Sequence, residues 1–469
     1  MATTDYDVIV VGSGLAGLSA ALNALESGAR VLVVEATGEA GGASRLSTGF
    51  ILGAGTRFQT DAGIEDSPDN FFQEYMNLQQ WKIQPALIQT YCYNSAASIE
   101  WLADQGVEIV DIVPAGEERF PRAHITPGGE HIISVLEGRL QRYDSFDIAL
   151  QARVNRLVRD ERGISGIRVE NETVTSKAVV LATGGFGSNA ELIDQFYPSA
   201  NSEAGGKVGY VGSRFATGDA FRLGKQIGAR IVRGRGSRAP HSVFSSAYLP
   251  SFAVLVNQFG RRFQDESIGY GVGEAVLAEQ PDAIAHILFD DCLKQSLRTT
   301  NDAKPYFSAG ATPVLEPGIT LWRSAVIDDF VERGDVLKAQ SLEELAVRLN
   351  IDKTGLRGTV KRYNQHVKAG FDADFLKDPA GLRAISQPPF YSTAVRLKNF
   401  GCTGIGLGIT NEAQVLHEDN LPLTGLFAAG ECSGGVLGEI YYGSGASLAN
   451  ALIFGRIAGT NAARLAQVS

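Results

Sequence analysis

The chain has 469 residues, of which 44% are hydrophobic and 54 are glycine. A chain of this length is too long for a single hydrophobic core and predicts roughly two or three domains. The glycine content predicts a globular, loop-rich fold around a ligand. The formal net charge is -10 and no lysine- or arginine-rich cluster occurs, which argues against binding to nucleic acid or an anionic membrane. Small molecules are the expected partners.

The N-terminal residues MATTDYDVIVVGSG contain no basic region, signal-type apolar segment or cleavage site, so a cytoplasmic location is expected. No apolar run is long enough to cross a bilayer, and any membrane contact is expected to be peripheral. The cysteines at positions 92, 292, 402 and 432 are far apart and form no C-x-x-C pair. We therefore expect no iron–sulfur cluster and no other metal site.

The stretch YDVIVVGSGLAGLSAALNALESGARVLVVEA, residues 6–36, gives the strongest local signal. An apolar strand at residues 8–11, a glycine turn, an amphipathic helix and a second apolar strand at residues 31–34 make up a βαβ unit. The unit ends in Glu35, which can accept hydrogen bonds from ribose hydroxyls.

The three glycines of this turn have separate roles. Gly12 permits the tight turn, Gly14 lets the backbone approach a pyrophosphate at the helix N-terminus, and Gly17 allows the helix to pack against the strand. Together with the terminal acid, this spacing predicts a bound dinucleotide.

Later motifs extend the nucleotide site. GEAGGASRLSTGF, residues 38–50, adds small and hydroxyl-bearing residues, and the apolar run AVVLATGG is suited to the strand that returns under the adenosine half. Residues 152–183 alternate in polarity and predict a small inserted hairpin. Glu431 follows the apolar strand LFAAG, where its carboxylate can contact ribityl hydroxyls.

In this order the motifs resemble the FAD-binding subunit family of fumarate reductase, succinate dehydrogenase and their relatives. The other stretches that carry the resemblance are VVLATGGFG (179–187), ATGDAFRLGKQIGA (216–229), NQFGRRFQDES (257–267), KRYNQHVKAGFDADFLK (361–377) and LFAAGECSGGVLG (426–438). The resemblance implies an α/β fold with a Rossmann-like FAD-binding domain and an inserted α+β capping domain that holds substrate.

A change in composition suggests where the insertion lies. The glycine fingerprint disappears after about residue 235, where a strand at FAVLVNQFG and a helix at SLEELAVRLNI are expected instead. We expect a discontinuous FAD-binding domain over residues 1–234 and 366–469, and a capping domain over residues 235–365. Closing of such a lid would exclude water from the flavin.

The predicted FAD-binding residues come from the βαβ unit and the later motifs. They are Gly12, Ser13, Gly14, Leu15, Ala16, Gly17, Glu35, Ala36, Gly41, Gly42, Ala43, Ser44, Val154, Ala182, Thr183, Gly184, Gly218, Asp219, Gly430, Glu431, Ser447 and Leu448. Membrane complexes of the family attach FAD through a histidine near GGASR, whereas residues 43–46 here read Ala-Ser-Arg-Leu. Noncovalent FAD is therefore expected.

Fumarate reductases of the family place cationic residues at three positions where this chain has none. Gly401 and Cys402 precede Thr403 where a histidine is expected, GEIYYGSG precedes the last helix where an arginine is expected, and Tyr270 replaces the proton-donating arginine after the R-F-x-x-E motif. Without these charges, a site would bind succinate or fumarate poorly.

Tyrosines stand at the second and third of these positions, and this pattern resembles the 3-ketosteroid dehydrogenases. In the Δ1 branch a tyrosine occupies the position of Tyr270, and YYGSGASLA matches its second motif with Tyr441 first and Gly445 four residues on. In the Δ4 branch the match places Tyr442 and Ser444 on a tyrosine and a serine. These five residues are the catalytic candidates; residues 122, 124, 391 and 396 are further candidates for lining the cavity.

The chemistry requires a base for the proton next to the ketone, a donor to the carbonyl and a hydride acceptor, which is flavin N5. Tyr270 is the candidate base, and since a free tyrosine has a pKa of about 10, it needs a lowered pKa or a relay to a second hydroxyl. Tyr441 or Tyr442, with the backbone N–H of Gly445, can polarise the carbonyl. The helix that starts near Ser447 turns its positive end toward the flavin.

These residues predict an FAD-dependent α,β-dehydrogenation of a hydrophobic cyclic ketone, with a 3-ketosteroid as the leading substrate. A smaller ring such as 4-oxocyclohexanecarboxylate is the nearest alternative. A reductase of an enone or an enoate such as urocanate or fumarate is the next, and a flavin-binding electron-transfer or assembly subunit is a different class. The sequence leaves open the external electron acceptor and the oligomeric state.

Overall fold

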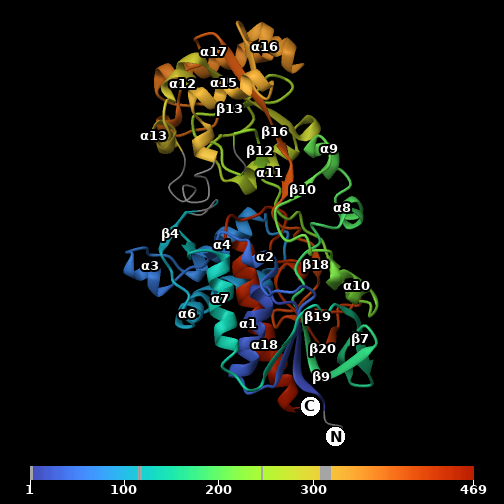
Figure 1. The fold of residues 1–469 in the computed structure, drawn as a ribbon. Coiled ribbons are helices and arrows are strands. Elements are labelled where there is room, and N and C mark those ends of the chain that lie inside the picture. The colour runs from blue at the N-terminus through green and yellow to red at the C-terminus, as the bar shows by residue number, and fades with distance from the viewer. Residues whose placement is uncertain (1–3, 115, 117–118, 245–246, 307–317, 469) are drawn as a thin grey trace.

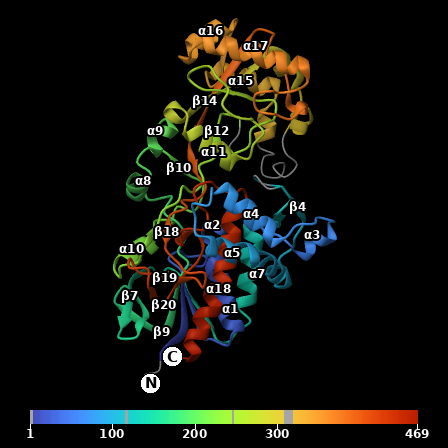
Figure 2. The same ribbon diagram turned by 180° about the vertical axis from the view of Figure 1, so that it is seen from behind.

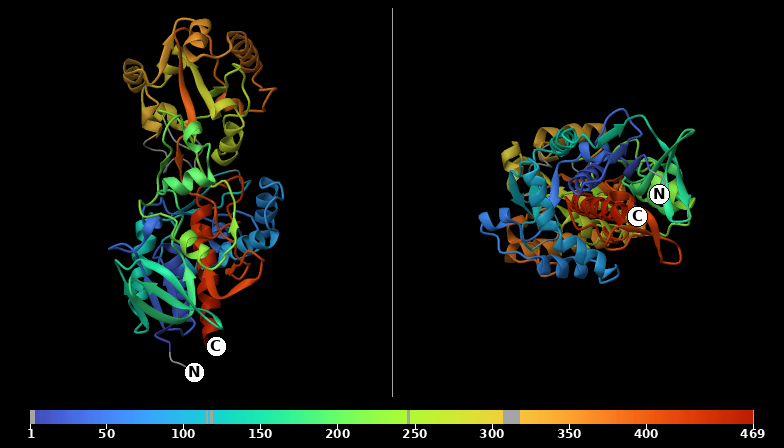
Figure 3. Two further views of the ribbon diagram at one scale, coloured as in Figure 1. Left: turned by 90° about the vertical axis from the view of Figure 1, so that its right-hand side faces the viewer. Right: turned by 90° about the horizontal axis from the view of Figure 1, so that it is seen from below.

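A computed structural model describes residues 4–114, 116, 119–244, 247–306 and 318–468. The chain forms two stacked lobes, of which the lower contains both termini and the upper is built from the middle of the chain (Figures 1 and 3). Within the described residues, no helix is both long and apolar enough to span a membrane.

The lower lobe is built around a mostly parallel sheet. Its strands follow the order β19-β20-β9-β1-β2-β6, and β1 pairs in parallel with β2 on one side and β9 on the other. The strands are β1 (Tyr6–Val11), β2 (Val31–Val34), β6 (Phe146–Ala149), β9 (Glu172–Leu181), β19 (Gln414–Leu416) and β20 (Pro422–Ala428). The predicted βαβ unit and the returning strand are thereby confirmed.

Two helices, α1 (Leu15–Glu26) and α18 (Ala446–Val468), lie side by side along this sheet (Figure 2). Their contact is close because α18 has glycine where it meets the backbone of α1. A Cβ at Gly455 would lie 2.5 Å from the carbonyl oxygen of Ala16, and one at Gly459 would lie 2.0 Å from that of Ala20. The C-terminal helix expected near Ser447 is thus a central packing element.

The predicted hairpin is present as two antiparallel pairs beside the main sheet. β7 (Val154–Asp160) pairs with β8 (Gly163–Val169), and β8 pairs with β9. A small separate sheet, in the order β3-β5-β4, covers another part of the lobe. Its strands are β3 (Phe50–Leu52), β4 (Asp111–Val113) and β5 (Ala123–Ile125).

Helices cover the lower lobe and the side of the junction. They are α2 (Gly42–Arg45), α3 (Arg57–Asp61), α4 (Pro68–Leu78), α5 (Pro85–Tyr93), α6 (Ser95–Asp104), α7 (Gly129–Leu140), α8 (Ala190–Phe196), α9 (Ala200–Ala204), α10 (Asp219–Lys225) and the 3-10 helix η5 (Gly430–Cys432). Two short pairs link segments near the junction, β10 (Gly209–Tyr210) with β17 (Asn399–Phe400) and β11 (Ile231–Val232) with β18 (Gly406–Leu407).

The upper lobe has its own antiparallel sheet, in the order β12-β16-β14-β13, with β15 also paired to β16. The strands are β12 (Pro240–His241), β13 (Val254–Val256), β14 (Ile284–Asp290), β15 (Leu337–Ala339) and β16 (Phe390–Leu397). The helices are α11 (Tyr270–Ala278), α12 (Asp291–Ser296), α13 (Thr300–Ala303), α15 (Ser324–Arg333), α16 (Leu342–Leu349), α17 (Lys353–Ala369), η1 (Pro281–Ala283), η2 (Lys304–Tyr306) and η4 (Pro379–Gly381).

The sheet pairing corrects the boundary expected at residue 365. β16 lies after that residue, yet it pairs with the whole length of β14, from Ile284 opposite Arg396 to Asp290 opposite Phe390. The change in glycine content could not reveal this, because strand pairing joins residues that are far apart in sequence. We propose that the inserted unit extends to about residue 397 and therefore includes β16.

Candidate functional site

A cavity of about 480 Å³ extends from the turn after β1 to the start of α11, so both lobes contribute to its wall. Most of the predicted FAD-binding residues line it. They are Gly12, Ser13, Gly14, Leu15, Ala16, Glu35, Ala36, Gly42, Ala43, Ser44, Val154, Ala182, Thr183, Gly184, Asp219, Gly430, Glu431, Ser447 and Leu448.

The glycines of the first turn meet different surroundings. Gly12 has φ +104°, and a Cβ there would lie 2.3 Å from the carbonyl oxygen of Ala182; a Cβ at Gly17 would lie 1.9 Å from that of Gly12. Gly14 is different, because a Cβ there would meet its nearest atom, Ser44 Oγ, only at 3.4 Å. Gly12 and Gly17 are therefore required by the protein's own packing, whereas Gly14 leaves open space toward the cavity.

Gly14 is also the N-cap of α1, and no side chain caps this helix end from the N-cap position. The first helical turn contains no acidic residue, and Ser44 Oγ accepts from the Leu15 N–H at 3.1 Å. A helix N-terminus with exposed N–H groups and a partial positive charge is a suitable binding place for a phosphate.

Two acidic side chains of the cavity wall accept hydrogen bonds from neighbouring residues of the protein. Glu35 Oε2 accepts from the Ser13 N–H at 3.0 Å and from the Ser13 hydroxyl at 2.5 Å. Glu431 Oε1 accepts from the Thr403 N–H at 2.7 Å and from its hydroxyl at 2.8 Å, and burial raises the pKa of Glu431. These contacts fix both carboxylates on the cavity wall.

Three predicted FAD-binding residues do not line the cavity. Gly17 is packed inside the first turn, Gly41 is the N-cap of α2 and Gly218 is the N-cap of α10. Gly41 and Gly218 hold lining residues through the backbone: the Gly41 N–H donates to the Ser13 carbonyl at 3.0 Å and the Gly218 N–H to the Gly185 carbonyl at 3.1 Å. Among the lining residues that were not predicted is Tyr210, whose buried hydroxyl has no hydrogen-bond partner among the described residues and is therefore available to a ligand. The wall as a whole fits a dinucleotide.

The other end of the cavity is lined by Tyr270, Tyr441, Ser444 and Gly445. The two tyrosines are each 7% exposed, and their ring centroids are 5.9 Å apart. Tyr270 is the first residue of α11 in the upper lobe, whereas Tyr441 precedes α18 in the lower lobe. The structure thus brings four of the five catalytic candidates together at one place.

Tyr441 is held with its oxygen toward the start of α18. Its hydroxyl accepts from the Ser447 N–H at 3.3 Å, which leaves the phenolic proton available for donation. Burial raises the pKa of Tyr441 well above its usual value, so the side chain stays neutral near pH 7. A neutral phenol at this position can donate to a carbonyl oxygen.

To act as a base, Tyr270 needs either a lowered pKa or a second hydroxyl that takes its proton, and the structure offers only the second. Burial raises the pKa of Tyr270 well above its usual value, while a hydrogen bond with Ser444 lowers it by a smaller amount. A lowered pKa is therefore not available, but a second hydroxyl is.

Tyr442 is placed away from the cavity, which corrects its inclusion among the catalytic candidates. Arg122 Nη1 donates to the Tyr442 hydroxyl at 2.6 Å, and that hydroxyl donates to Glu74 at 3.2 Å. The ring is 1% exposed and is stacked on Tyr75 at 4.8 Å. Adjacent residues of an extended segment point in opposite directions, and here Tyr441 is the one that faces the cavity.

The additional candidates for lining the cavity lie elsewhere. Arg122 is fully buried between Asp66 and Glu74, with hydrogen bonds of 2.6 and 2.5 Å, and His124 is held by Thr56 at 2.7 Å. Tyr391 donates to Asp291 in the upper lobe, and Arg396 lies in β16; neither lines the cavity.

Among the described lining residues, Arg153 is the one cationic side chain, and it pairs with Asp219 at 2.8 Å. The tyrosine end of the cavity therefore presents hydroxyl groups, with Cys402 and Ser237 nearby on the wall. Such a surface suits a neutral carbonyl compound better than a dicarboxylate.

One buried acid lies a helical turn beyond Tyr270. Glu274 is 2% exposed, its Oε2 accepts from the Arg238 N–H at 2.7 Å, and burial raises the pKa of Glu274 to about 7. Sequence reasoning did not identify this residue, since no motif includes it.

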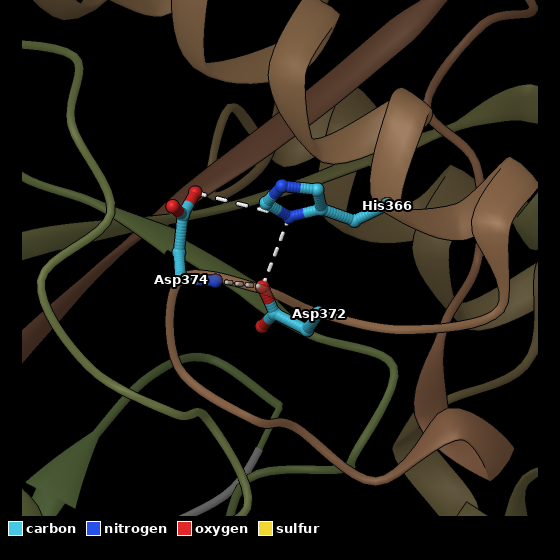
Figure 4. A group of neighbouring side chains, drawn as sticks. All are labelled: His366, Asp372 and Asp374. Carbon is cyan, nitrogen blue, oxygen red and sulfur yellow. Dashed lines mark hydrogen bonds and ion pairs between the residues drawn. The ribbon is translucent and has the colours of Figure 1, made fainter.

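The upper lobe also brings His366, Asp372 and Asp374 together at the end of α17 (Figure 4). His366 Nδ1 lies 3.0 Å from Asp372 Oδ1 and 3.8 Å from Asp374 Oδ2. Each carboxylate also pairs with an arginine, Asp372 with Arg262 at 2.9 Å and Asp374 with Arg362. These ion pairs account for the grouping as part of the packing of the lobe.

Comparison with known proteins places this site in a family. A family model described as an FAD binding domain matches residues 7–448. The NADH:fumarate oxidoreductase of Klebsiella pneumoniae (strain 342) is 31% identical over 99% of this chain, which spans 48% of that protein. The urocanate reductase of Eggerthella lenta is 30% identical over 99% of this chain and 75% of its own length.

A solved structure that resembles this fold is the 3-ketosteroid-Δ4-(5α)-dehydrogenase from Rhodococcus jostii RHA1, in complex with 4-androstene-3,17-dione. It is 26% identical, has a TM-score of 0.78, and the match covers 99% of this chain and 98% of that one. The sequence relatives named above are reductases, whereas this structural neighbour is a dehydrogenase. The chain belongs to the FAD binding domain family and is a flavin-dependent oxidoreductase related to the fumarate reductase flavoproteins.

Proposed function

We propose that this protein dehydrogenates a cyclic ketone at the carbon–carbon bond next to the carbonyl, with a 3-ketosteroid as the leading substrate and noncovalently bound FAD. The observation that carries the proposal is the group formed by Tyr270, Tyr441 and Ser444 at the end of the cavity. The helix N-terminus, the acidic side chains and the open space at Gly14 would hold FAD, which supplies the hydride acceptor.

The group supplies the two protein functions that α,β-dehydrogenation needs. Tyr441 is a neutral donor whose oxygen is fixed by Ser447, so it can hydrogen-bond a ketone oxygen and stabilise the enolate that develops there. Tyr270 lies across from it and can receive the proton from the adjacent carbon, because Ser444 can take the phenolic proton in turn.

Tyr441 and Gly445 both line the cavity, and they are the residues that the alignment with the Δ1 motif selects. Ser444, which the alignment with the Δ4 motif selects, lines the cavity as well. The position of the new double bond is therefore left to experiment. A smaller ketone such as 4-oxocyclohexanecarboxylate is the nearest alternative substrate. Among the described lining residues only Arg153 could offer a cation to its carboxylate, and Arg153 is already paired with Asp219.

Reduction of an enone or enoate is the second candidate, and the reductases among the sequence relatives favour it. The same hydroxyls can serve either direction, because a group that accepts a proton in one direction donates it in the other. The cavity weighs against fumarate and urocanate, since both carry carboxylates and Arg153 is already paired with Asp219.

Anaerobic stopped-flow spectroscopy of the FAD-loaded protein tests the proposal. The panel contains 5α- and 5β-3-ketosteroids, Δ4-3-ketosteroids, cyclohexanone, 4-oxocyclohexanecarboxylate and succinate. Loss of the oxidised-flavin absorbance with one class of saturated ketone is the expected result. If no ketone reduces the flavin, and only an enone or enoate reoxidises chemically reduced protein, the enzyme is a reductase and the proposed direction is overturned.

A further inference from the structure

A third tyrosine, Tyr248, contacts the side chains that carry the proposed chemistry. Its hydroxyl oxygen lies 2.9 Å from Ser444 Oγ, in a hydrogen bond in which either oxygen can be the donor. Its ring meets that of Tyr270 edge-on, with centroids 5.2 Å apart and planes at 73°. Tyr248 is absent from the described wall of the cavity, so it reaches the site through these two residues.

The upper lobe fixes the position of Tyr248. The preceding residue, Ala247, has φ +72°, a conformation that is uncommon for a residue with a side chain, and its N–H donates to the Pro240 carbonyl at 2.9 Å. The Tyr248 ring packs against buried residues of both the lower-lobe and the upper-lobe cores. A hydrogen bond from Tyr248 to Ser444 therefore joins the two lobes at the catalytic group.

The proposed reaction creates a need that Tyr248 can meet. Dehydrogenation releases one proton, yet Tyr270 and Tyr441 are each only 7% exposed. Tyr248 is partly exposed and is hydrogen-bonded to Ser444, the hydroxyl partner of Tyr270. The three hydroxyl groups thus form a continuous sequence from the buried Tyr270 to a side chain that reaches the surface.

We propose that Tyr248 is the outer member of a proton relay that runs from Tyr270 through Ser444 to solvent, an inference that rests on the proposed function. As the carbon–hydrogen bond next to the carbonyl breaks, the Tyr270 oxygen accepts that proton and its own proton passes to Ser444. The serine proton passes to Tyr248, and the Tyr248 proton passes to water. Each hydroxyl gains one proton and loses one. The electron pair of the broken carbon–hydrogen bond forms the new carbon–carbon double bond, and the hydrogen on the neighbouring carbon leaves with its own electron pair as hydride, for which bound FAD would be the acceptor.

The relay predicts a particular pH profile for Tyr248→Phe, which keeps the ring and removes the hydroxyl. Without the relay, Tyr270 must ionise before it can accept a proton, and the titratable groups that face it are Tyr441, Tyr248 and Cys402. Flavin reduction by ketone should be at least about tenfold slower than in wild type at pH 7 and should rise with pH. The wild-type rate should be flat across neutral pH, because its relay works with neutral hydroxyls.

The experiment compares anaerobic flavin reduction between pH 6 and pH 9 in the FAD-loaded wild type, Tyr248→Phe, Ser444→Ala and the double variant. The control is Tyr391→Phe, which removes a buried hydroxyl of the same lobe that binds Asp291 at 2.9 Å and lines no part of the described cavity. The control should behave as wild type. The double variant should be no slower than Ser444→Ala alone, because both changes interrupt one route.

FAD content and the dissociation constant for the ketone, measured from the flavin absorbance, should be unchanged in Tyr248→Phe. A rate within twofold of wild type overturns the relay, as does a slower rate with a flat pH profile or with weaker ketone binding, since each means that the hydroxyl carries no proton. If no ketone reduces the wild-type flavin, the proposed function itself fails and the relay fails with it.

Discussion

Exchanging each of the adjacent tyrosines for phenylalanine separates catalysis from stability. Tyr441→Phe removes a hydroxyl that faces the cavity and accepts from the Ser447 N–H at 3.3 Å. Loss of one preorganised donor to a developing oxyanion typically lowers the rate by about 10²–10³-fold, or about 3–4 kcal/mol of activation free energy. Only the weak backbone hydrogen bond is lost from the fold, so the free energy of unfolding should fall by about 1 kcal/mol.

Tyr442→Phe should give the opposite result. Its hydroxyl accepts from the fully buried Arg122 at 2.6 Å and contacts Glu74 at 3.2 Å, and hydrogen bonds to charged groups contribute about 1.5–3 kcal/mol. The free energy of unfolding should fall by about 2 kcal/mol, while the rate of flavin reduction stays close to that of wild type. Each variant is therefore the matched control for the other.

The assays are anaerobic stopped-flow reduction by the ketone that reduces wild type and urea denaturation of the FAD-loaded protein. If Tyr442→Phe reduces flavin slowly while Tyr441→Phe retains the wild-type rate, the two side chains have the opposite orientation to the one described. If Tyr441→Phe keeps a rate within about threefold of wild type, Tyr441 is not the oxyanion donor, because that loss is far smaller than such a donor implies.

Three further predictions concern the cofactor and a buried acid. Gly14→Val should lower FAD affinity at least about tenfold, by filling the space for the pyrophosphate, yet leave the melting temperature of the FAD-free protein nearly unchanged; equal FAD affinity would contradict this. Acid precipitation should release all FAD into the supernatant, and flavin retained on the protein would show a covalent link. Burial raises the pKa of Glu274 from 4.5 to about 7, so the folded state favours the protonated acid. The stabilisation is complete below pH 4.5, and the free energy of unfolding should fall by about 3 kcal/mol as the pH rises to 7. In urea unfolding between pH 5 and pH 8, Glu274→Gln should lack this decline; if its free energy of unfolding falls with pH as in wild type, Glu274 is not the cause.

The nucleotide half could be predicted from local sequence. The alternation of strand, glycine turn and helix in residues 6–36 depends on backbone geometry and on hydrophobic periodicity within a few turns, and the observed β1, α1 and β2 follow it. Gly12 and Gly17 are required by contacts inside the same turn, so their meaning is readable without the rest of the fold.

The catalytic half depended on contacts between distant segments. The sequence placed Tyr441 and Tyr442 next to the last helix, but only the packing of Arg122 and Tyr75 against Tyr442 decided that Tyr441 faces the cavity. Tyr248 belongs to no motif and reaches Ser444 across 196 positions of the chain. Strand β16 likewise joins the upper sheet through β14, whose pairing no local pattern encodes. Local sequence determines the backbone that holds a nucleotide. The direction of each tyrosine side chain is decided by the tertiary structure, because its hydroxyl must find a hydrogen-bond partner and its ring a packing partner among residues far away in the sequence.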